Sequence, residues 1–487
     1  MRYLLMKQPQ VLRYFFLTEV WERFGFYTIQ TLLVLYMVSA LNFSDNKSYT
    51  IIGEFTALAY IMPLLGGYLA DRILGYRFSI VLGGILLCVG YALLGIFSES
   101  ILIGLSLIIM GNGLFKPNIS SFLGQFYDEN DPRRDSGYTL FYIGINIGGL
   151  VAPLLGGFIQ QWLGWNACFA VASIGLIIGV ITFRMSYRYL QNKGFSPRYP
   201  TFKKLPKLLI SKPQISLGLI AIIAATFTLM NFPTITTNLL NIIGGILIVG
   251  LIILAIKQNP LERKHMATLI VMLLFSVVFW GLFFEMYFSV NLFTERAVNR
   301  TIGTFTIPTA AIIGLESTFI IILGPIFALV WQRMNPKTRF MTTPYKFAYA
   351  LLFIAIAFEL LAWVIQHTGV GTPVNVAWMI LFYALFVMAE LFLSPIGLSM
   401  ITTLSPAKYV GLMMGVWFIT LGYGGALSGF LAQDSNIPET ITALADQMQI
   451  YKHAFQHFAN FGFAAFAVLL IAAPVLTKLM FSNSDSK

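Results

Sequence analysis

Long apolar runs separated by short polar segments follow one another along the whole chain. A helix needs about 20 mainly apolar residues to cross the hydrocarbon core of a bilayer, whereas a strand of a membrane barrel needs only about ten. Helices are therefore predicted for the fourteen runs at residues 11–38, 50–72, 78–97, 100–122, 138–161, 166–187, 214–231, 237–256, 267–295, 307–332, 345–366, 375–403, 409–432 and 455–480. The pattern predicts an all-α integral membrane protein.

The positive charges agree with one topology of these spans, in which both termini are cytoplasmic. In that topology the outside segments hold only four of the 31 Lys and Arg residues, namely Lys47, Arg296, Arg300 and Lys452. Arg23 and Lys116 lie within spans, and the other 25 fall on the cytoplasmic side, as the positive-inside rule requires. Topology thus explains the formal net charge of +11, and no nucleic-acid partner is predicted.

The spans form two blocks of six with a further pair between them. The predicted parts are an N-terminal six-helix bundle, a basic cytoplasmic linker, an extra transmembrane pair and a C-terminal six-helix bundle, at residues 11–187, 188–213, 214–257 and 258–487. Two six-helix bundles are the arrangement of major facilitator transporters, whose substrate sites lie near the midplane between the halves. The prediction of a major facilitator fold therefore rests on the number of spans.

Composition excludes a soluble globular protein, because only 10% of the residues are charged, against about 25% in a typical soluble chain. No cleavable signal peptide is expected, since no small-residue cleavage site follows the basic opening. Cys88 and Cys168 lie in apolar runs and predict no disulfide framework. We expect no metal site, cofactor or enzymatic activity, because no catalytic constellation or phosphate loop is visible and every histidine lies near a predicted span end or in a loop.

The apolar runs nevertheless contain ionisable side chains, among them Glu19, Glu22, Arg23, Lys116, Glu285, Glu316, Glu359 and Glu390. Each costs roughly 2.5–3.5 kcal/mol to insert and usually faces a cavity or a partner. In the first span the i, i+3 and i, i+4 spacing places Glu19, Glu22 and Arg23 on one face. Two acids beside one base suit a proton relay balanced by a cation such as Lys116; the alternative is that they only pair to hold helices together. Glu359, near an outer end, is predicted to be structural or interfacial.

Several motifs carry a family resemblance. The stretch "EVWERFGFY" (19–27) resembles the first-helix signature of proton-dependent oligopeptide transporters, and "GGYLADRILGYR" (66–77) resembles their second- to third-helix turn. The stretch from 111 to 157, beginning "GNGLFKPNISSF", is similar almost throughout, as are "AELFLSPIGLS" (389–399) and "GLMMGVWF" (411–418). The resemblance spans essentially the whole chain, including the extra helix pair of bacterial members.

The resemblance implies a symporter that couples inward proton flow to uptake of di- and tripeptides by alternating access, in a bacterial inner membrane. Glu19, Glu22, Arg23, Lys116 and Glu285 would couple protons, the only ion expected, and Glu390 would bind the peptide amino group and pair with Lys116 on closure. The substrate-binding set would be Tyr27, Gln30, Tyr60, Lys116, Asn146, Glu316, Glu390 and Trp417. Gating would involve Asp71, Arg72, Lys116, Glu390 and Pro395. Without the motifs, Tyr60 and Trp417 could be packing aromatics, and Asn146 could serve close helix packing.

The chain departs from the family pattern at the residues that define cargo. Phe26 replaces a tyrosine, Gln30 replaces an arginine of many members, and Glu316 lies where relatives usually have asparagine. Loss of the arginine removes a fixed charge and a bidentate donor and leaves Glu285 without that cation. Either several of the embedded acids are protonated at rest, or the preferred substrate carries extra positive charge. We expect a bias towards cationic cargo, such as peptides that contain Lys or Arg, or a basic amine.

Other functions stay open at this point. The same machinery could carry another small solute, such as an amino acid or a basic amine, and a non-transporting receptor is a further alternative. The expected partners are a small peptide and the lipid bilayer, with a monomer as the functional unit.

Overall fold

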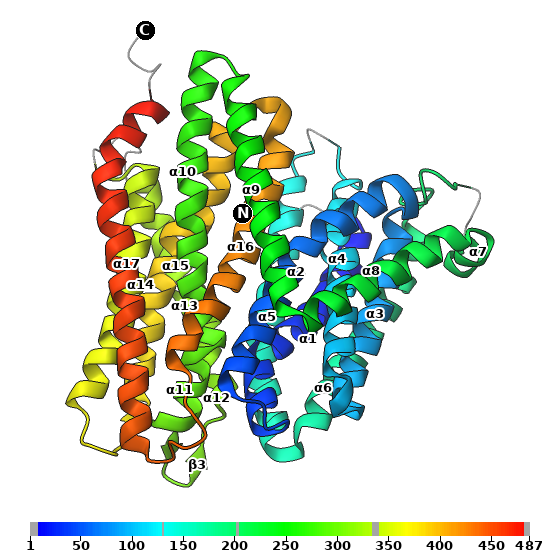
Figure 1. Cartoon of the computed structure of the whole chain (residues 1–487). Coiled ribbons are helices and arrows are strands. Elements are labelled where there is room, and N and C mark those ends of the chain that lie inside the picture. Colours follow the sequence, from blue (N-terminus) through cyan, green and yellow to red (C-terminus); the bar gives the residue numbers. More distant parts are fainter. Residues whose placement is uncertain (1–7, 129–130, 201–203, 334–339, 482–487) are drawn as a thin grey trace. The chain divides into compact units, whose positions relative to one another are not determined.

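The structure is a computed structural model that describes residues 8–128, 131–200, 204–333 and 340–481. Figure 1 shows the helices of this part, which are α1 (Val11–Ser39), α2 (Asp45–Leu69), α3 (Tyr76–Ile96), α4 (Ile101–Gly124), α5 (Arg134–Leu163), α6 (Trp165–Met185), α7 (Leu205–Ser211), α8 (Pro213–Asn231), α9 (Pro233–Ile256), α10 (Pro260–Phe283), α11 (Ser289–Ala297), α12 (Thr309–Ile313), α13 (Leu315–Arg333), α14 (Thr343–His367), α15 (Ala377–Leu404), α16 (Val410–Leu431) and α17 (Leu444–Met480). Shorter helical turns lie at Ala70–Leu74, Ser98–Ser100, Ser186–Tyr189, Phe284–Tyr287, Ala407–Tyr409 and Ala432–Ser435.

The four strands are only two residues long: β1 (Val298–Asn299), β2 (Thr301–Ile302), β3 (Phe305–Thr306) and β4 (Val374–Asn375). β1 pairs with β4 in parallel, and β2 pairs with β3 as an antiparallel hairpin. Gly303, between β2 and β3, has φ +63°, a conformation that glycine adopts without steric cost. The strands therefore only tie connecting loops together.

Thirteen helical segments of the described residues are long and apolar enough to cross a membrane. The 29-residue α1 is not among them, because its polar and charged residues, Glu22 and Arg23 included, lower its mean hydropathy. With α1 included, these segments correspond one to one to the fourteen predicted spans, and the all-α membrane architecture is confirmed. The largest difference in bounds is α17, which begins at Leu444 and not at 455, because polar residues extend the helix beyond its apolar part.

The chain packs into two compact units. Unit 1 comprises Met1–Tyr36 and Leu58–Phe232, and unit 2 comprises Met37–Ala57 and Pro233–Lys487. Helix α2 therefore contributes one half to each unit. The units reflect packing and not order along the chain, so the division of the sequence into two bundles, a linker and a pair stays a prediction.

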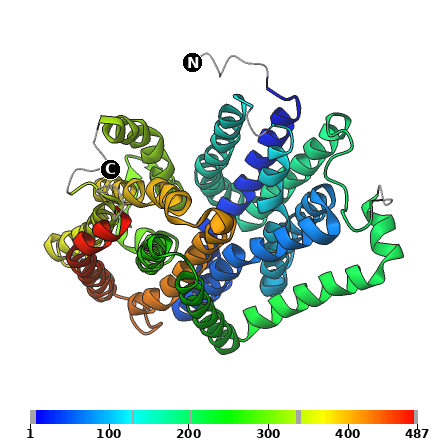
Figure 2. The ribbon, with the colours of Figure 1, turned by 90° about the horizontal axis from the view of Figure 1, so that it is seen from above.

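Unit 1 is held together by close helix contacts around α3 and α4. A Cβ at Gly66 of α2 would lie 1.9 Å from the carbonyl oxygen of Gly113 of α4, so only glycine permits this approach of the two backbones. Leu208 of α7 and Leu219 of α8 join Leu74, Phe78 and other apolar residues of one buried cluster. These contacts hold α7, which lies within the predicted linker, and α8, which follows it, against α3 and α4 (Figure 2).

Unit 2 contains a helix interruption that the apolar pattern did not indicate. The predicted span 267–295 is divided into α10 and α11 by the turn Phe284–Tyr287 and by Phe288, whose φ and ψ are −110° and −103°. Helix α14 packs on α15 and α17, and α10 packs on α16. The interruption matters because it carries Glu285.

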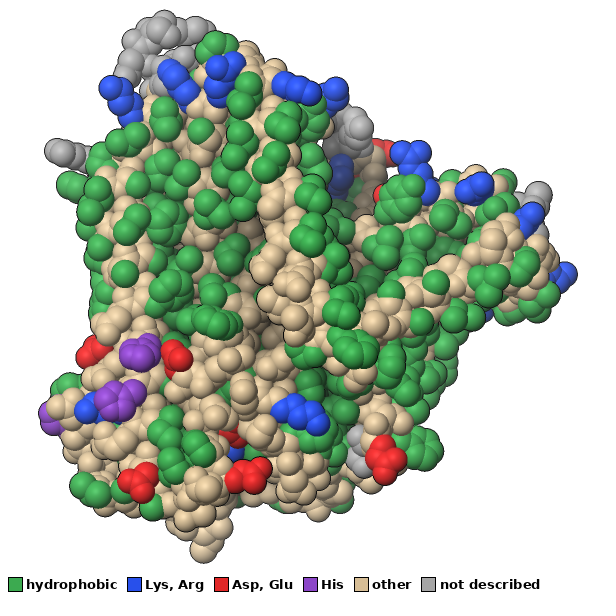
Figure 3. All heavy atoms as spheres, viewed as in Figure 1, with side chains coloured by type: hydrophobic (Ala, Val, Ile, Leu, Met, Phe, Trp, Pro, Cys, Tyr) green, Lys and Arg blue, Asp and Glu red, His purple; other side chains and the backbone are tan. Residues whose placement is uncertain are grey.

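The surface of unit 2 has the distribution expected of a membrane protein. In Figure 3 a broad hydrophobic band separates an end rich in Lys and Arg from an end with Asp, Glu and His. Ile246 and Ile471 are 68% and 78% exposed, which suits contact with lipid tails. Lys257 and Lys264, where α9 passes into α10, are exposed.

Candidate functional site

Helix α1 carries a buried ionic cluster of Glu19, Glu22 and Arg23. Arg23 binds Glu22 in bidentate fashion, with Nε 2.5 Å from Oε2 and Nη2 2.6 Å from Oε1. Its Nε also lies 3.5 Å from Glu19 Oε1. All three residues are at most 2% exposed. The structure thus brings together the three residues that the sequence places on one face, and their formal charges sum to one net negative.

Helix α4 fixes the position of Arg23 through a residue that the sequence analysis did not single out. Asn112 Oδ1 accepts a 3.2 Å hydrogen bond from Arg23 Nη2, and Asn112 Nδ2 donates to the Ala59 carbonyl at 2.8 Å. Asn112 stands four residues before Lys116, on the same face of α4. That spacing within "GNGLFK" is the signal that could have identified it.

Phe26 lies between the arginine of the cluster and Lys116. Its ring centroid is 4.8 Å from Arg23 Cζ and 5.8 Å from Lys116 Nζ. Lys116 Nζ is also 5.0 Å from the centroid of the Tyr60 ring, and it has no ion pair within 4.0 Å among the described residues. The Phe26 ring, which lacks the tyrosine hydroxyl, therefore makes a cation–π contact with each of the two cations.

The glycines of "GINIGG" let α5 approach α1 closely. A Cβ at Gly148 would lie 2.6 Å from the Cβ of Arg23, and one at Gly149 would lie 3.2 Å from the Tyr27 ring. The Asn146 amide donates to the Tyr142 carbonyl of its own helix at 2.8 Å. The glycines thus serve close helix packing, and a role of Asn146 in substrate binding stays a prediction. Gln30, one turn beyond Tyr27, is 1% exposed.

At the turn after α2 the expected gating pair is exposed, and a different arginine is buried. Asp71 and Arg72 are both exposed, with Asp71 accepting a 2.7 Å hydrogen bond from the Tyr76 hydroxyl. Arg77 is 4% exposed and donates to the carbonyls of Lys193 at 2.6 Å, Leu190 and Gln191. Arg77 therefore anchors the segment that follows α6, a role that the sequence analysis missed.

In unit 2, serines occupy the hydrogen-bonding positions around Glu285. Glu285 is fully buried and accepts hydrogen bonds from the hydroxyls of Ser289 and Ser428, the latter at 2.9 Å. Ser289 is one turn beyond Glu285, whereas Ser428 comes from α16, 143 residues away. Local spacing could have indicated Ser289, but nothing in the sequence connects Ser428 to this site.

Glu316 and Glu390 form a pair of carboxyl groups on α13 and α15. The two carboxyl groups are close enough to interact with each other, and Ser317 donates to Glu316 at 2.7 Å. Two carboxylates offer only acceptors, so a hydrogen bond between them requires one shared proton. Oε2 of Glu390 is buried without a hydrogen-bond partner among the described residues, so this oxygen can accept a further donor.

The remaining predicted residues of unit 2 divide into packed and exposed positions. Trp417 is 3% exposed, and its ring fills the space beside Gly397, where a Cβ would lie 2.0 Å away. Pro395 lies within α15, two residues before that glycine. Glu359 is exposed on α14. In the part of the chain that the structure describes, no group of three His, Cys, Asp or Glu side chains could hold a metal ion.

Comparison with known proteins gives consistent matches. A model described as the POT family matches residues 77–448. The chain is 30% identical to dipeptide and tripeptide permease A of Klebsiella pneumoniae (strain 342), over 98% of this chain and 94% of that protein. A crystal structure of a variant peptide transporter POT in complex with alafosfalin matches with a TM-score of 0.83 and 27% identity, covering 98% of this chain and 97% of that one. Tetrameric PepTSo2 matches with a TM-score of 0.82 and 25% identity, covering 96% and 98% of the two chains.

Proposed function

Because the chain belongs to the POT family, we propose that it imports di- and tripeptides across a bacterial inner membrane by alternating access. The observation that carries this proposal is the similarity over 98% of the chain to a dipeptide and tripeptide permease. A related transporter structure contains alafosfalin.

Both termini face the cytoplasm, which the basic residues at one end of unit 2 support. The functional unit is a monomer, although one related structure is tetrameric.

Protons drive the uptake, and the cluster of Glu19, Glu22 and Arg23 with Lys116 handles them. The support is geometric: two buried acids compete for one arginine, whose closer bonds go to Glu22. Glu19 Oε2 has no hydrogen-bond partner among the described residues. Glu19 is therefore the acid that most readily takes up a proton. The positive charge of Lys116 favours the release of that proton.

Glu390 receives the amino end of the cargo, and Glu316 beside it favours a second positive charge. Without cargo the two carboxyl groups share a proton; an ammonium group replaces that proton with three donors. Gln30 supplies no charge to offset these acids. The cargo is therefore biased towards peptides that contain Lys or Arg.

A second candidate is the same mechanism with another small solute, such as an amino acid or a basic amine. The specific observation in its favour is that Glu285 is bonded to two serines, in a chain where Gln30 replaces the arginine expected for the peptide carboxylate. A solute without a carboxylate needs no such cation. A receptor that does not transport has no use for a proton-handling cluster.

Uptake of labelled dialanine into proteoliposomes, with and without an inward proton gradient, tests the function. Accumulation that depends on the gradient supports the proposed symport. Saturable binding without accumulation supports a receptor instead. Gradient-driven accumulation of a basic amine, with none of dialanine, supports the second candidate.

A further inference from the structure

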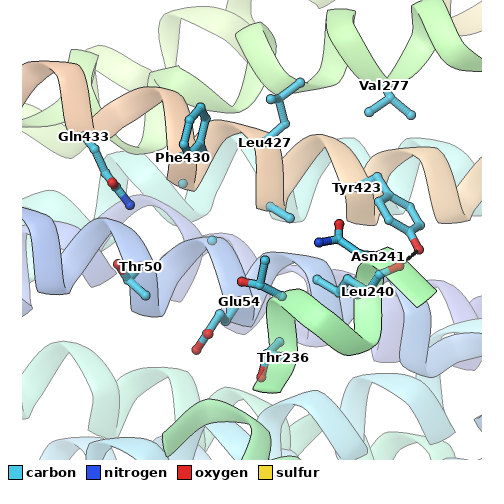
Figure 4. A pocket seen from close by; sticks show the side chains of 14 residues that line it. Thr50, Glu54, Thr236, Leu240, Asn241, Val277, Tyr423, Leu427, Phe430 and Gln433 are labelled. Carbon is cyan, nitrogen blue, oxygen red and sulfur yellow. Dashed lines mark hydrogen bonds between the residues drawn. The ribbon is translucent and has the colours of Figure 1, made fainter. Parts of the chain in front are cut away.

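A buried carboxyl group lines a pocket of unit 2 that plays no part in the proposed transport cycle. The pocket has a volume of about 400 Å³ and lies among α2, α9, α10 and α16. Figure 4 shows Glu54 and Thr50 on α2, Asn241 on α9, and Tyr423 and Phe430 on α16 around it. All these residues belong to unit 2.

Glu54 lacks the partners that a buried carboxyl group normally has. It is 7% exposed, and neither carboxyl oxygen has a hydrogen-bond partner among the described residues. It forms no ion pair within 4.0 Å in that part of the chain. A buried charge without a partner costs several kcal/mol, so this position favours a ligand that brings both hydrogen-bond donors and positive charge.

The other polar groups of the pocket suit an ammonium group better than a metal ion. The side-chain amides of Asn241 and Gln433 line the pocket, and their oxygens are acceptors. The Glu54 carboxylate offers two acceptor oxygens to the donors of an ammonium group, whereas the Asn241 and Gln433 amides lie at different ends of the pocket (Figure 4). A divalent cation such as Ca²⁺ requires about six to eight oxygen ligands, more than these side chains supply.

The apolar walls and the depth of the pocket indicate an amphiphile. Leu240, Leu427 and Phe430 line the pocket, and Phe430 is 69% exposed, so the pocket is continuous with the apolar outer surface. Glu54 lies four residues into the predicted span 50–72, or ~6 Å along the helix. Glu54 is therefore within reach of a lipid headgroup at the end of the span.

We propose that this pocket binds the ammonium headgroup of a membrane amphiphile, with Glu54 as its anionic partner and the tail along the apolar wall that ends at Phe430. Phosphatidylethanolamine in the bilayer and a soluble alkylamine share this chemistry. The site is separate from the clusters assigned to protons and cargo, so the proposal does not depend on which solute is carried.

Native mass spectrometry of the purified full chain in micelles tests the site, with phosphatidylethanolamine, phosphatidylglycerol and dodecylamine as probes. Glu54→Gln removes the charge and keeps the shape; Ala426→Phe fills the pocket from α16. Glu359→Gln removes an exposed carboxyl group elsewhere in unit 2 and serves as the control. We expect Glu54→Gln to weaken retention of phosphatidylethanolamine about tenfold, Ala426→Phe to abolish it, and the control to leave it unchanged.

Equal retention of phosphatidylethanolamine and of dodecylamine by the unsubstituted protein and by Glu54→Gln would overturn the proposal. So would the same dependence on Glu54 for phosphatidylglycerol, which has no amine. Dependence on Glu54 for dodecylamine alone supports the ammonium site and assigns its ligand to soluble amphiphiles. Each variant is compared by ligand retention and not by uptake. A failure of the ammonium-site proposal is therefore distinguishable from a failure of the proposed transport function.

Discussion

The Ser428 hydroxyl donates a 2.9 Å hydrogen bond to the buried Glu285 carboxylate, which joins α16 to the interruption between α10 and α11. Replacement of Ser428 by alanine leaves that carboxylate with one fewer donor in a fully buried position. Removal of one partner of a buried polar pair costs about 1–3 kcal/mol. We expect Ser428→Ala to lower the free energy of unfolding by this amount, measured by titration with sodium dodecyl sulfate.

The matched control for that change is Ser276→Ala in α10. Ser276 is also fully buried, but its hydroxyl donates only to the Met272 carbonyl of its own helix, at 2.9 Å. A carbonyl within a helix keeps its backbone hydrogen bond when the serine is removed. If both substitutions destabilise the protein equally, the bond to Glu285 has no special stabilising role.

Close packing of α5 on α1 gives a second prediction. Gly148→Ala would place a Cβ 2.6 Å from the Cβ of Arg23 and 2.8 Å from the Val20 carbonyl oxygen. Such overpacking costs about 1–3 kcal/mol, so we expect a lower midpoint of thermal unfolding and a displaced Arg23.

Gly156→Ala, on the same helix, separates packing from helix propensity. Its Cβ would meet its nearest neighbour, Leu32, at 3.5 Å, an ordinary van der Waals distance. Alanine is favoured over glycine within a helix by roughly 0.5–1 kcal/mol. The expected result is therefore unchanged or higher stability, and destabilisation at both positions would show that contact with Arg23 is not the cause.

Hydropathy predicted the spans well, because an apolar run of about 20 residues in a membrane has few alternatives to a helix. It could not predict the interruption beside Glu285, since the residues around it are as apolar as those of a regular helix. Hydropathy also placed the start of the last span at 455, because only the later part of α17 is apolar enough to be identified as a span.

Site residues within one helix were easier to predict than partners from different helices. The i, i+4 spacing placed Glu19 next to Arg23, and the structure has them 3.5 Å apart. Ser428, in contrast, reaches Glu285 only through the packing of α16 on α10. The apolar neighbours of Glu54 in the sequence gave no indication of a pocket, which the chain forms only where α9 and α16 meet α2.

The ionic cluster predicts a separation of two transport activities. Glu22→Gln removes one acid that binds Arg23, and Lys116→Ala removes the cation beside the Phe26 ring. Each should lower gradient-driven uptake at least about tenfold, or ~1.4 kcal/mol, because protons no longer exchange in step with cargo. Counterflow exchange in proteoliposomes, which needs no net proton movement, should be partly retained.

Glu359→Gln controls for the general effect of losing an acid, since Glu359 is exposed on α14. It should leave both activities unchanged. Loss of both uptake and counterflow in a correctly folded Glu22→Gln protein would assign Glu22 to cargo binding and not to proton coupling.

The carboxyl pair on α13 and α15 predicts the charge preference of the cargo. Glu316→Gln keeps the shape of the side chain but removes one of two acids that interact with each other. Inhibition of labelled dialanine uptake by Lys-Ala, Ala-Ala and Asp-Ala measures the preference. The unsubstituted protein should favour Lys-Ala, and Glu316→Gln should reduce its advantage over Asp-Ala about tenfold, or ~1.4 kcal/mol. Equal inhibition by acidic and basic dipeptides before any substitution would rule out the cationic bias, while leaving peptide transport itself unaffected.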